Sequence, residues 1–451
     1  MQPLRYLILS LLTLALVSCK TTSSFSDREA LTLPEAYVTT EPETLEVKES
    51  LLALFGDEAL RRLVDQALEE NPELLRVRAR MEELGFNLQK TSAARLPVLS
   101  ANGAGGRQKR VNIPTTSSYT ASLDVRWEVD VWGRIRSGVS AAEADQASAV
   151  AAYDAARQSL AAQTMKAWFQ LVATEKTLDL NQRRIDSFSS TFDLVQRRFE
   201  LGNARLAAVE LARTDLENAR ADIEASQGRR DQAARQLRVL VGAYPDADVQ
   251  AKAWPALNAS VPAGLPSDLL RKRPDVLAAY EAVRAADARV QVAHADLFPS
   301  FALTGSAGRG SDTLSDLVKS GFDIWSIAGN LSTPLFEAGR RQAEVDAAGK
   351  RAEQAFYSYQ STVINALREV EDALGSETFL AGEERARLKA LVAARAAEDR
   401  SRRDYEAGVS DILSLLETQR RVFTTEQQSI NIRAARLNNR VALALALGKG
   451  T

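Results

Sequence analysis

The sequence predicts a mostly helical fold with membrane β-strands, made of two long α-helical hairpins in tandem and four strands per chain. One segment alternates strictly between apolar and polar residues, as a strand with two different faces does. A second stretch keeps a helical pattern for longer than compact domains use. The chain then repeats both patterns, so each half is expected to contribute two strands and one hairpin.

The clearest strand pattern runs from Tyr119 to Trp132, with apolar residues at odd positions and mostly polar or charged residues at even ones. This length suits a strand that crosses a membrane at a tilt, although a half-buried strand of a soluble sheet alternates in the same way. The membrane alternative predicts a lipid-facing set and a lumen-facing set. The lipid-facing residues are Leu123, Val125, Trp127 and Val129, and the lumen-facing residues are Asp124, Arg126, Glu128 and Asp130.

The longest helical pattern follows directly, from Ile135 to Glu200. It contains no proline and no glycine after Gly138, and its apolar residues step by three and four, as in a coiled coil. A helix of this length would reach about 100 Å at 1.5 Å per residue. Gly202 is expected to end it, and a returning helix to Gly242 would complete a hairpin.

Glycine and proline positions recur in step along the chain, which indicates an internal duplication. Pro299 follows Pro97 by 202 positions, and Gly408 follows Gly202 by 206. A four-residue difference within the strand region keeps the two copies in register over nearly the whole chain. The second pair of strands is expected at Ser300–Gly310 and Phe322–Phe336.

The N-terminus has the pattern of a secretion signal. Arg5 precedes the apolar run Tyr6–Val17, which is too short for a stable membrane anchor. The run ends in Leu-Val-Ser-Cys and resembles the bacterial lipobox, which implies lipidation of Cys19. Lys20 follows, and the resemblance to lipoproteins without Asp at that position implies outer-membrane retention. Cys19 is the only cysteine, so no disulfide framework is expected.

These signals divide the chain into six predicted segments. They are a signal peptide (1–18), a lipidated N-terminal arm (19–56), a first structural repeat (57–242), a linker (243–266), a second structural repeat (267–448) and a C-terminal tail (449–451).

Four strands per chain cannot close a membrane barrel around a lumen, which needs at least about eight strands. Either the sheet is soluble, or several identical chains each contribute four strands to one barrel. Two chains would supply eight strands and three would supply twelve, and symmetric closure suits both.

The lipobox, the duplication, the strand pairs that each lead into a long helix, and the turn sequence Tyr405–Glu417 together resemble the outer-membrane efflux factors. These are the TolC-like family, in its NodT-type lipoprotein branch, and the likeness covers nearly the whole mature chain. The resemblance implies a homotrimer with a twelve-stranded outer-membrane β-barrel and a periplasmic α-barrel. It implies a passive exit duct for small molecules, such as drugs or toxic compounds, delivered by a periplasmic adaptor (membrane fusion protein) and an inner-membrane pump of the resistance-nodulation-division type.

The resemblance also implies a periplasmic gate. Family members line the closed end with an apolar ring and an acidic ring, and the register from Gly408 places Leu413 and Glu417 at these rings. The family usually has Asp where this chain has Glu417. The alternative is that Leu413 is an ordinary seam residue and Glu417 a solvated flank. Gly202 and Gly408 are expected to adopt positive φ at the hairpin tips, and the resemblance brings these tips to the adaptor.

Other function classes find little support in the sequence. The net charge of −2 shows no basic excess for nucleic acid. There is no Walker loop, Cys/His metal cluster or nucleophile motif, so we expect no cofactor and no enzyme activity. His294, the only histidine, is expected to be structural. The runner-up is a non-pore periplasmic adaptor or structural coiled-coil lipoprotein, and an envelope lipoprotein enzyme is more remote.

Overall fold

The computed structural model describes residues 34, 37–38, 55–112, 114–251, 253–256, 269–319, 321 and 323–448. Cys19, the signal peptide, the C-terminal tail and most of the predicted arm lie outside these residues. The described chain forms two compact units. The first contains Arg80–Val150 and Ala278–Ser361, and the second contains the described parts of Leu33–Ala79, Ala151–Leu277 and Thr362–Thr451.

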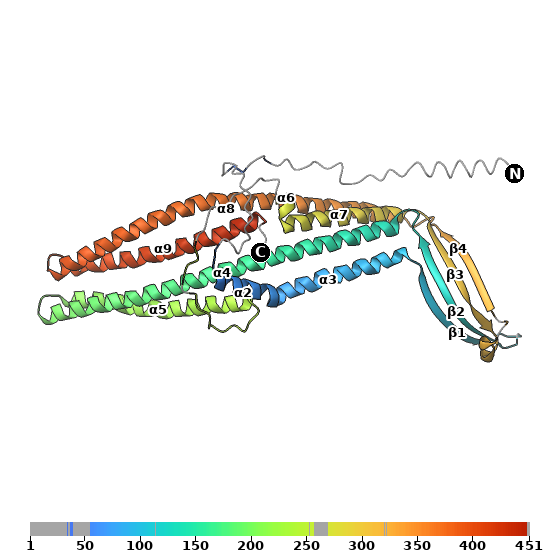
Figure 1. Ribbon diagram of the computed structural model, residues 1–451, viewed down its shortest axis with the longest axis horizontal. Coiled ribbons are helices and arrows are strands. Elements are labelled where there is room, and N and C mark those ends of the chain that lie inside the picture. Colours follow the sequence, from blue (N-terminus) through green and yellow to red (C-terminus); the bar gives the residue numbers. More distant parts are fainter. Residues whose placement is uncertain are drawn as a thin grey trace. The chain divides into compact units, whose positions relative to one another are not determined.

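Four long helices dominate the chain and come in two matched pairs (Figure 1). Helices α4 (Arg134–Glu200) and α8 (Arg340–Glu406) have 67 residues each. Helices α5 (Leu206–Leu240) and α9 (Ile412–Ala446) have 35 residues each. Helices α8 and α9 begin and end 206 positions after α4 and α5, respectively, in agreement with the duplication. No helix among the described residues combines the length and apolarity needed to cross a membrane.

Shorter helices precede each strand pair. They are α2 (Glu58–Glu70), α3 (Pro72–Ser92), α6 (Leu269–Lys272) and α7 (Pro274–Ala295). The 3₁₀ turn η2 (Ala93–Arg95) follows α3, and η4 (Leu314–Val318) lies between the two strands of the second pair.

Asn71 separates α2 from α3. Its side-chain oxygen accepts hydrogen bonds from two backbone amides in the first turn of α3, and Pro72 starts the helix without an N–H that would need an acceptor. The Asn71 amide nitrogen donates to Leu240 O at the end of α5, 2.9 Å away. In the second half, Arg273 donates in the same way to Ala446 O at the end of α9. The two halves therefore share this contact as well as their elements.

The first unit contains one antiparallel sheet in the order β1-β2-β3-β4 (Figure 1). Strand β1 (Val98–Gln108) pairs with β2 (Thr116–Val129), and β3 (Ser300–Ser311) pairs with β4 (Asp323–Ser332). Strands β2 and β3 also pair, so the sheet joins the two halves of the duplication.

Register places most of the large apolar residues of the four strands on one face of the sheet. Val125 lies opposite Leu99 on β1 and opposite Gly305 on β3, which in turn pairs with Ile327 on β4. Because side chains alternate along a strand, the polar residues Asp124 and Arg126 of β2 occupy the other face. The division is incomplete at the strand ends, where Arg309 and Asp323 lie on the apolar face and Val98 and Ile324 on the polar one. The apolar face is uncovered in the single chain, where Trp325 is 78% exposed.

The core of the second unit lies between the two long hairpins. Phe188 on α4, Leu216 on α5 and Leu415 and Leu416 on α9 belong to one buried cluster. Each of these side chains is no more than 4% exposed. Burial of this apolar surface holds the α4–α5 hairpin against the α8–α9 hairpin.

Candidate functional site

The polar face of the sheet carries a carboxylate that accepts hydrogen bonds from its own strand and from a neighbouring one. Asp124 on β2 accepts hydrogen bonds from Asn102 on β1 and from Ser122 Oγ, the latter at 3.0 Å. Arg126 lies two residues further along the same face and is exposed. The face therefore presents hydrogen-bonding and charged groups side by side, and it contrasts with the apolar face behind it.

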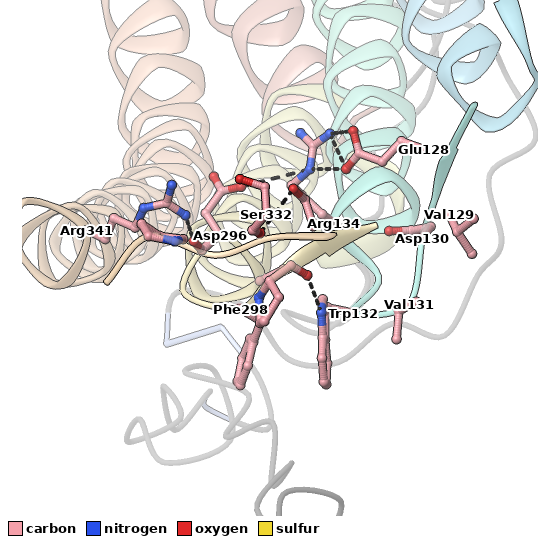
Figure 2. A pocket seen from close by; sticks show the side chains of 14 residues that line it. Glu128, Val129, Asp130, Val131, Trp132, Arg134, Asp296, Phe298, Ser332 and Arg341 are labelled. Atoms are coloured by element: carbon pink, nitrogen blue, oxygen red, sulfur yellow. Dashed lines mark hydrogen bonds and ion pairs between the residues drawn. The ribbon is translucent and has the colours of Figure 1, made fainter. Parts of the chain in front are cut away.

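The junction between strand β2 and helix α4 forms a polar cavity of about 250 Å³ (Figure 2). Arg134, the first residue of α4, donates two hydrogen bonds of 3.0 and 2.7 Å to the two carboxylate oxygens of Glu128. The Trp132 ring stacks on Phe298 with centroids 4.7 Å apart, and its Nε1 donates to Pro299 O. These contacts fix the angle at which the strand turns into the helix.

Asp130 has a different role from the predicted one. Strand β2 ends at Val129, and the Asp130 carboxylate accepts hydrogen bonds from the backbone amides of Ile135 and Arg136. A carboxylate here satisfies free amides at the helix N-terminus and faces the positive end of the helix dipole. The assignment of Asp130 as a lumen-facing strand residue is therefore wrong, because the helix start competes for its side chain.

The two hairpin tips have the glycine geometry that the sequence predicts. Gly202 and Gly408 both adopt φ of 76°, in the left-handed region that disfavours other residues. The amide of Gly202 donates to Phe199 O, and that of Gly408 donates to Tyr405 O. Glycine is thus the residue that lets each long helix reverse within a few positions.

The two tips also contact each other through Arg198 and Tyr405. The Arg198 guanidinium donates to Tyr405 O and lies 4.8 Å from the centre of the Tyr405 ring. Burial raises the pKa of the Tyr405 hydroxyl, although the positive charge of Arg198 opposes the shift. This contact links the end of α4 to the end of α8 within one chain.

Leu413 and Glu417 are both exposed on α9. Leu413 is 56% exposed, whereas the neighbouring Leu415 and Leu416 are 1% exposed and form the packed seam. Glu417 accepts a 3.0 Å hydrogen bond from Arg421 one turn later. Within the chain, Leu413 is therefore not a seam residue, and the two predicted gate side chains are free to meet other groups.

Polar contacts between the hairpins were missed by sequence reasoning. Arg420 on α9 donates to both carboxylate oxygens of Asp215 on α5, at 3.1 and 2.8 Å. Gln419, which is fully buried, donates to Ser187 and Thr191 on α4. Their signal in the sequence is weak, because charge and amide residues are common on these helices and their partners lie more than 200 positions away.

Glu426 on α9 forms a second polar contact between the hairpins. It accepts hydrogen bonds from Arg183 on α4 at 2.6 Å and from Arg395 on α8 at 2.7 Å. Burial favours a higher pKa for the Glu426 carboxyl, but the two guanidinium groups outweigh burial and hold the pKa below its ordinary value. The carboxylate is therefore ionised wherever this contact is intact.

The described residues contain no group of three or more His, Cys, Asp or Glu side chains that could hold a metal ion. His294 packs edge-on against Phe298, with ring centroids 5.5 Å apart. This aromatic contact is a structural one, as expected for the only histidine.

The comparisons with known proteins cover nearly the whole chain. The family model of outer membrane efflux proteins matches residues 63–243 and 265–449. The cation efflux system protein CusC of Escherichia coli K12 is 28% identical over 401 residues, or 88% of each protein. The solvent efflux pump outer membrane protein SrpC of Pseudomonas putida is 30% identical over 405 residues, which is 88% of this chain and 86% of SrpC.

Among solved structures, the open state of the Neisseria gonorrhoeae MtrE outer membrane channel matches with a TM-score of 0.86 and 31% identity. The match covers 94% of this chain and 97% of MtrE.

Proposed function

The chain belongs to the outer membrane efflux protein family, and we propose that three copies of it form one exit duct. Family members are channel proteins of tripartite efflux systems, and this chain is an outer-membrane channel component with a long periplasmic portion. In the proposed homotrimer, the sheets form a twelve-stranded barrel in the outer membrane and the hairpins form a periplasmic α-barrel.

The observation that carries this proposal is the four-stranded sheet with two unlike faces. Among the described residues, strands β1 and β4 each pair on one side only, so both edges of this sheet are open in the single chain. An open edge cannot face lipid, because its backbone groups would lose their hydrogen bonds. Joining β1 of one copy to β4 of the next satisfies both edges, and three copies supply about the number of strands that encloses a lumen.

In this barrel, one face of the sheet contacts lipid and the other contacts the lumen. Lipid contacts the apolar face, which includes Leu123, Val125, Trp127 and Val129, and the lumen contacts the polar face with Asp124 and Arg126. Glu128 shares the polar face, where its pairing with Arg134 places a neutralised ion pair at the end of the barrel.

The remaining assignments concern the two ends of the duct. Cys19 is the proposed lipidation site that anchors the chain to outer-membrane lipid. Leu413 and Glu417 are the proposed gate residues, and the tips at Gly202 and Gly408 are the proposed contact with the periplasmic adaptor. Three Glu417 carboxylates around one axis would repel each other and hold cations, while three Leu413 side chains would form a collar that excludes water.

The duct itself is proposed to be passive and to carry no enzyme activity. The matched relatives differ in cargo, since CusC is named for cation efflux and SrpC for solvent efflux. We therefore assign cargo choice to the inner-membrane pump, of the resistance-nodulation-division type, and its adaptor. Small toxic molecules or ions are the expected cargo.

Two measurements on the purified full-length protein test this function. Native mass spectrometry should find a trimer, and planar bilayers should record single-channel currents. A monomer that produces no current would refute the duct and favour the alternative, a non-pore adaptor or structural lipoprotein. For the anchor, Cys19→Ala should abolish the lipid mass and release the protein from the outer-membrane fraction, and an unchanged mass would refute the assignment.

A further inference from the structure

The internal duplication provides a template for the contact between copies. Each residue of the α4–α5 hairpin has a counterpart 206 positions later in the α8–α9 hairpin. Within the chain, the first hairpin contributes an "Asp215 face" and the second a "Gln419 face" to their common seam. The Asp215 face consists of Arg183, Ser187, Thr191 and Asp215, and the Gln419 face consists of Gln419, Arg420 and Glu426.

The counterparts of both faces are uncovered. The counterpart of the Asp215 face lies on the second hairpin, and we call it the Arg421 face. All of its residues are exposed: Lys389, Ala393, Ala397 and Arg421. The counterpart of the Gln419 face lies on the first hairpin and is called the Arg213 face; it consists of Arg213, Thr214 and Arg220, also all exposed. Gln419 is fully buried in the chain, whereas the Arg213 side chain is 53% exposed.

We propose that the Arg421 face of one copy packs against the Arg213 face of the next, in the register of the seam within the chain, and that this seam lacks the ion pairs of its counterpart and opens first. The inference rests on the proposed ring of copies. A head-to-tail contact of this kind closes by rotation, because each copy presents one face of each type.

Side-chain size supports the register. Within the chain, Gln419 lies against Ser187 and Thr191. At the equivalent place between copies, the longer Arg213 faces the shorter Ala393 and Ala397. Arg213 is larger than Gln419, and Ala393 and Ala397 are smaller than Ser187 and Thr191. The added side-chain volume on one face is therefore offset by smaller side chains on the other, as close packing requires.

Charge distinguishes the two seams. Within the chain, Asp215 pairs with Arg420. Between copies, Arg421 stands at the position of Asp215 and Thr214 at the position of Arg420, so this place has no acidic residue. Within the chain, Glu426 pairs with Arg183 and Arg395. Between copies, Arg220 stands at the position of Glu426, and Lys389 stands at the position of Arg183. Two cations then face each other where the chain's own seam has an ion triad.

The three arginines of the exposed faces pair with acidic residues of their own helices. Arg213 pairs with Glu210, Arg220 with Glu217, and Arg421 with Glu417, each three or four residues away. Such pairs contribute little and do not cross the seam. The seam between copies therefore depends on apolar and van der Waals contact. Its separation should need less free energy than separation of the two hairpins within one chain.

Crosslinking the full chain tests the register. Thr214→Cys combined with Arg421→Cys, treated with a short bis-maleimide, should produce covalent dimers and trimers on a denaturing gel. The matched control, Asp215→Cys with Arg420→Cys, should keep the mobility of the monomer because its partners lie within one chain. A native trimer whose Thr214/Arg421 variant never crosslinks between chains would overturn the register and leave the duct intact, whereas a monomeric wild type would overturn both.

Restoring the missing charge tests the weakness of the seam. Thr214→Asp places a carboxylate opposite Arg421 of the next copy and should raise the dissociation temperature of the trimer by a few degrees. It should also lower the open fraction in bilayers. Thr214→Asn, which has the same shape without the charge, should match the wild type. Equal dissociation temperatures for the Asp and Asn variants would refute the proposed pairing.

Discussion

The two hairpins have the same lengths and the same glycine turns, yet different chemistry holds each one together. In the α4–α5 hairpin, Leu171 and Ala234 are fully buried. Their counterparts in the α8–α9 hairpin are Glu377 and Arg440, which pair at 2.8 Å. Glu377 also pairs with Arg436, which continues to the buried Glu384.

At these equivalent positions one backbone thus accepts either apolar or ionic contacts, although elsewhere the α4–α5 hairpin also has the ion pairs Arg184–Asp222 and Arg230–Glu175. An apolar seam gains stability from area removed from water and is insensitive to salt. An ionic seam carries a desolvation cost and depends on every partner staying in place. The first hairpin is therefore expected to respond to lost volume, and the second to a lost charge or to changed solution conditions.

Leu171→Ala should be the most damaging change. It removes a fully buried side chain and leaves a cavity, so the free energy of unfolding should fall by about 3 kcal/mol. Urea denaturation followed by helical circular dichroism measures the loss, which should be the same at low and high salt. A loss that depends strongly on salt would contradict the apolar character of this seam.

Glu377→Ala should cost less, about 2 kcal/mol, because Glu377 is partly exposed and the full penalty of ~3–5 kcal/mol applies to buried pairs. The change removes the Glu377 carboxylate from Arg440, whose side chain is mostly buried. The same denaturation experiment should show the difference from wild type shrinking as salt rises. Equal losses at all salt concentrations would erase the contrast between the hairpins.

Gly408→Ala and Gly202→Ala should each cost about 1 kcal/mol, since an L side chain at this positive φ is strained. Space is not limiting at either tip: a Cβ at Gly408 would lie 3.5 Å from Arg198 Nη2, and a Cβ at Gly202 would have no neighbour within 4 Å. The two variants should therefore melt at the same temperature. A clear difference between them would mean that the tips are not equivalent.

The seam between the hairpins should weaken in acid through Glu426. The pKa of this carboxyl is lowered in the folded chain, so its stabilisation is complete above the unfolded-state pKa and is lost as pH falls through the folded-state pKa. Glu426→Gln should reduce stability at neutral pH and flatten the pH dependence below about 4.5. A melting profile against pH measures both effects, and an unchanged profile would exclude Glu426 as a source.

Glu417→Ala should have the smallest effect on stability, because the side chain is exposed and its pair with Arg421 lies on the surface. Its effect should appear in bilayers instead, as higher conductance or weaker block by multivalent cations. Glu417→Gln separates charge from side-chain length. Unchanged conductance and block in both variants would reject the acidic ring.

Most of the elements could be predicted from local patterns. The helix expected at Ile135–Glu200 is observed at Arg134–Glu200, because no proline and no glycine after Gly138 interrupts it and Gly202 stops it. The alternating segment was placed three residues too late at both ends: β2 is Thr116–Val129. Alternation alone could not reveal that Asp130 serves the helix start, since a strand end and a helix cap both accept an acidic residue.

The sequence by itself determined the duplication, the hairpins and the two unlike faces of the sheet, because periodicity and glycine positions are local properties of the chain. Only the tertiary structure decided that Asp215 pairs with Arg420 and that Gln419 lies between Ser187 and Thr191. Such pairings depend on how far each helix is rotated about its own axis. That rotation is fixed by the packing of residues such as Phe188 and Leu416, and no single helix specifies it.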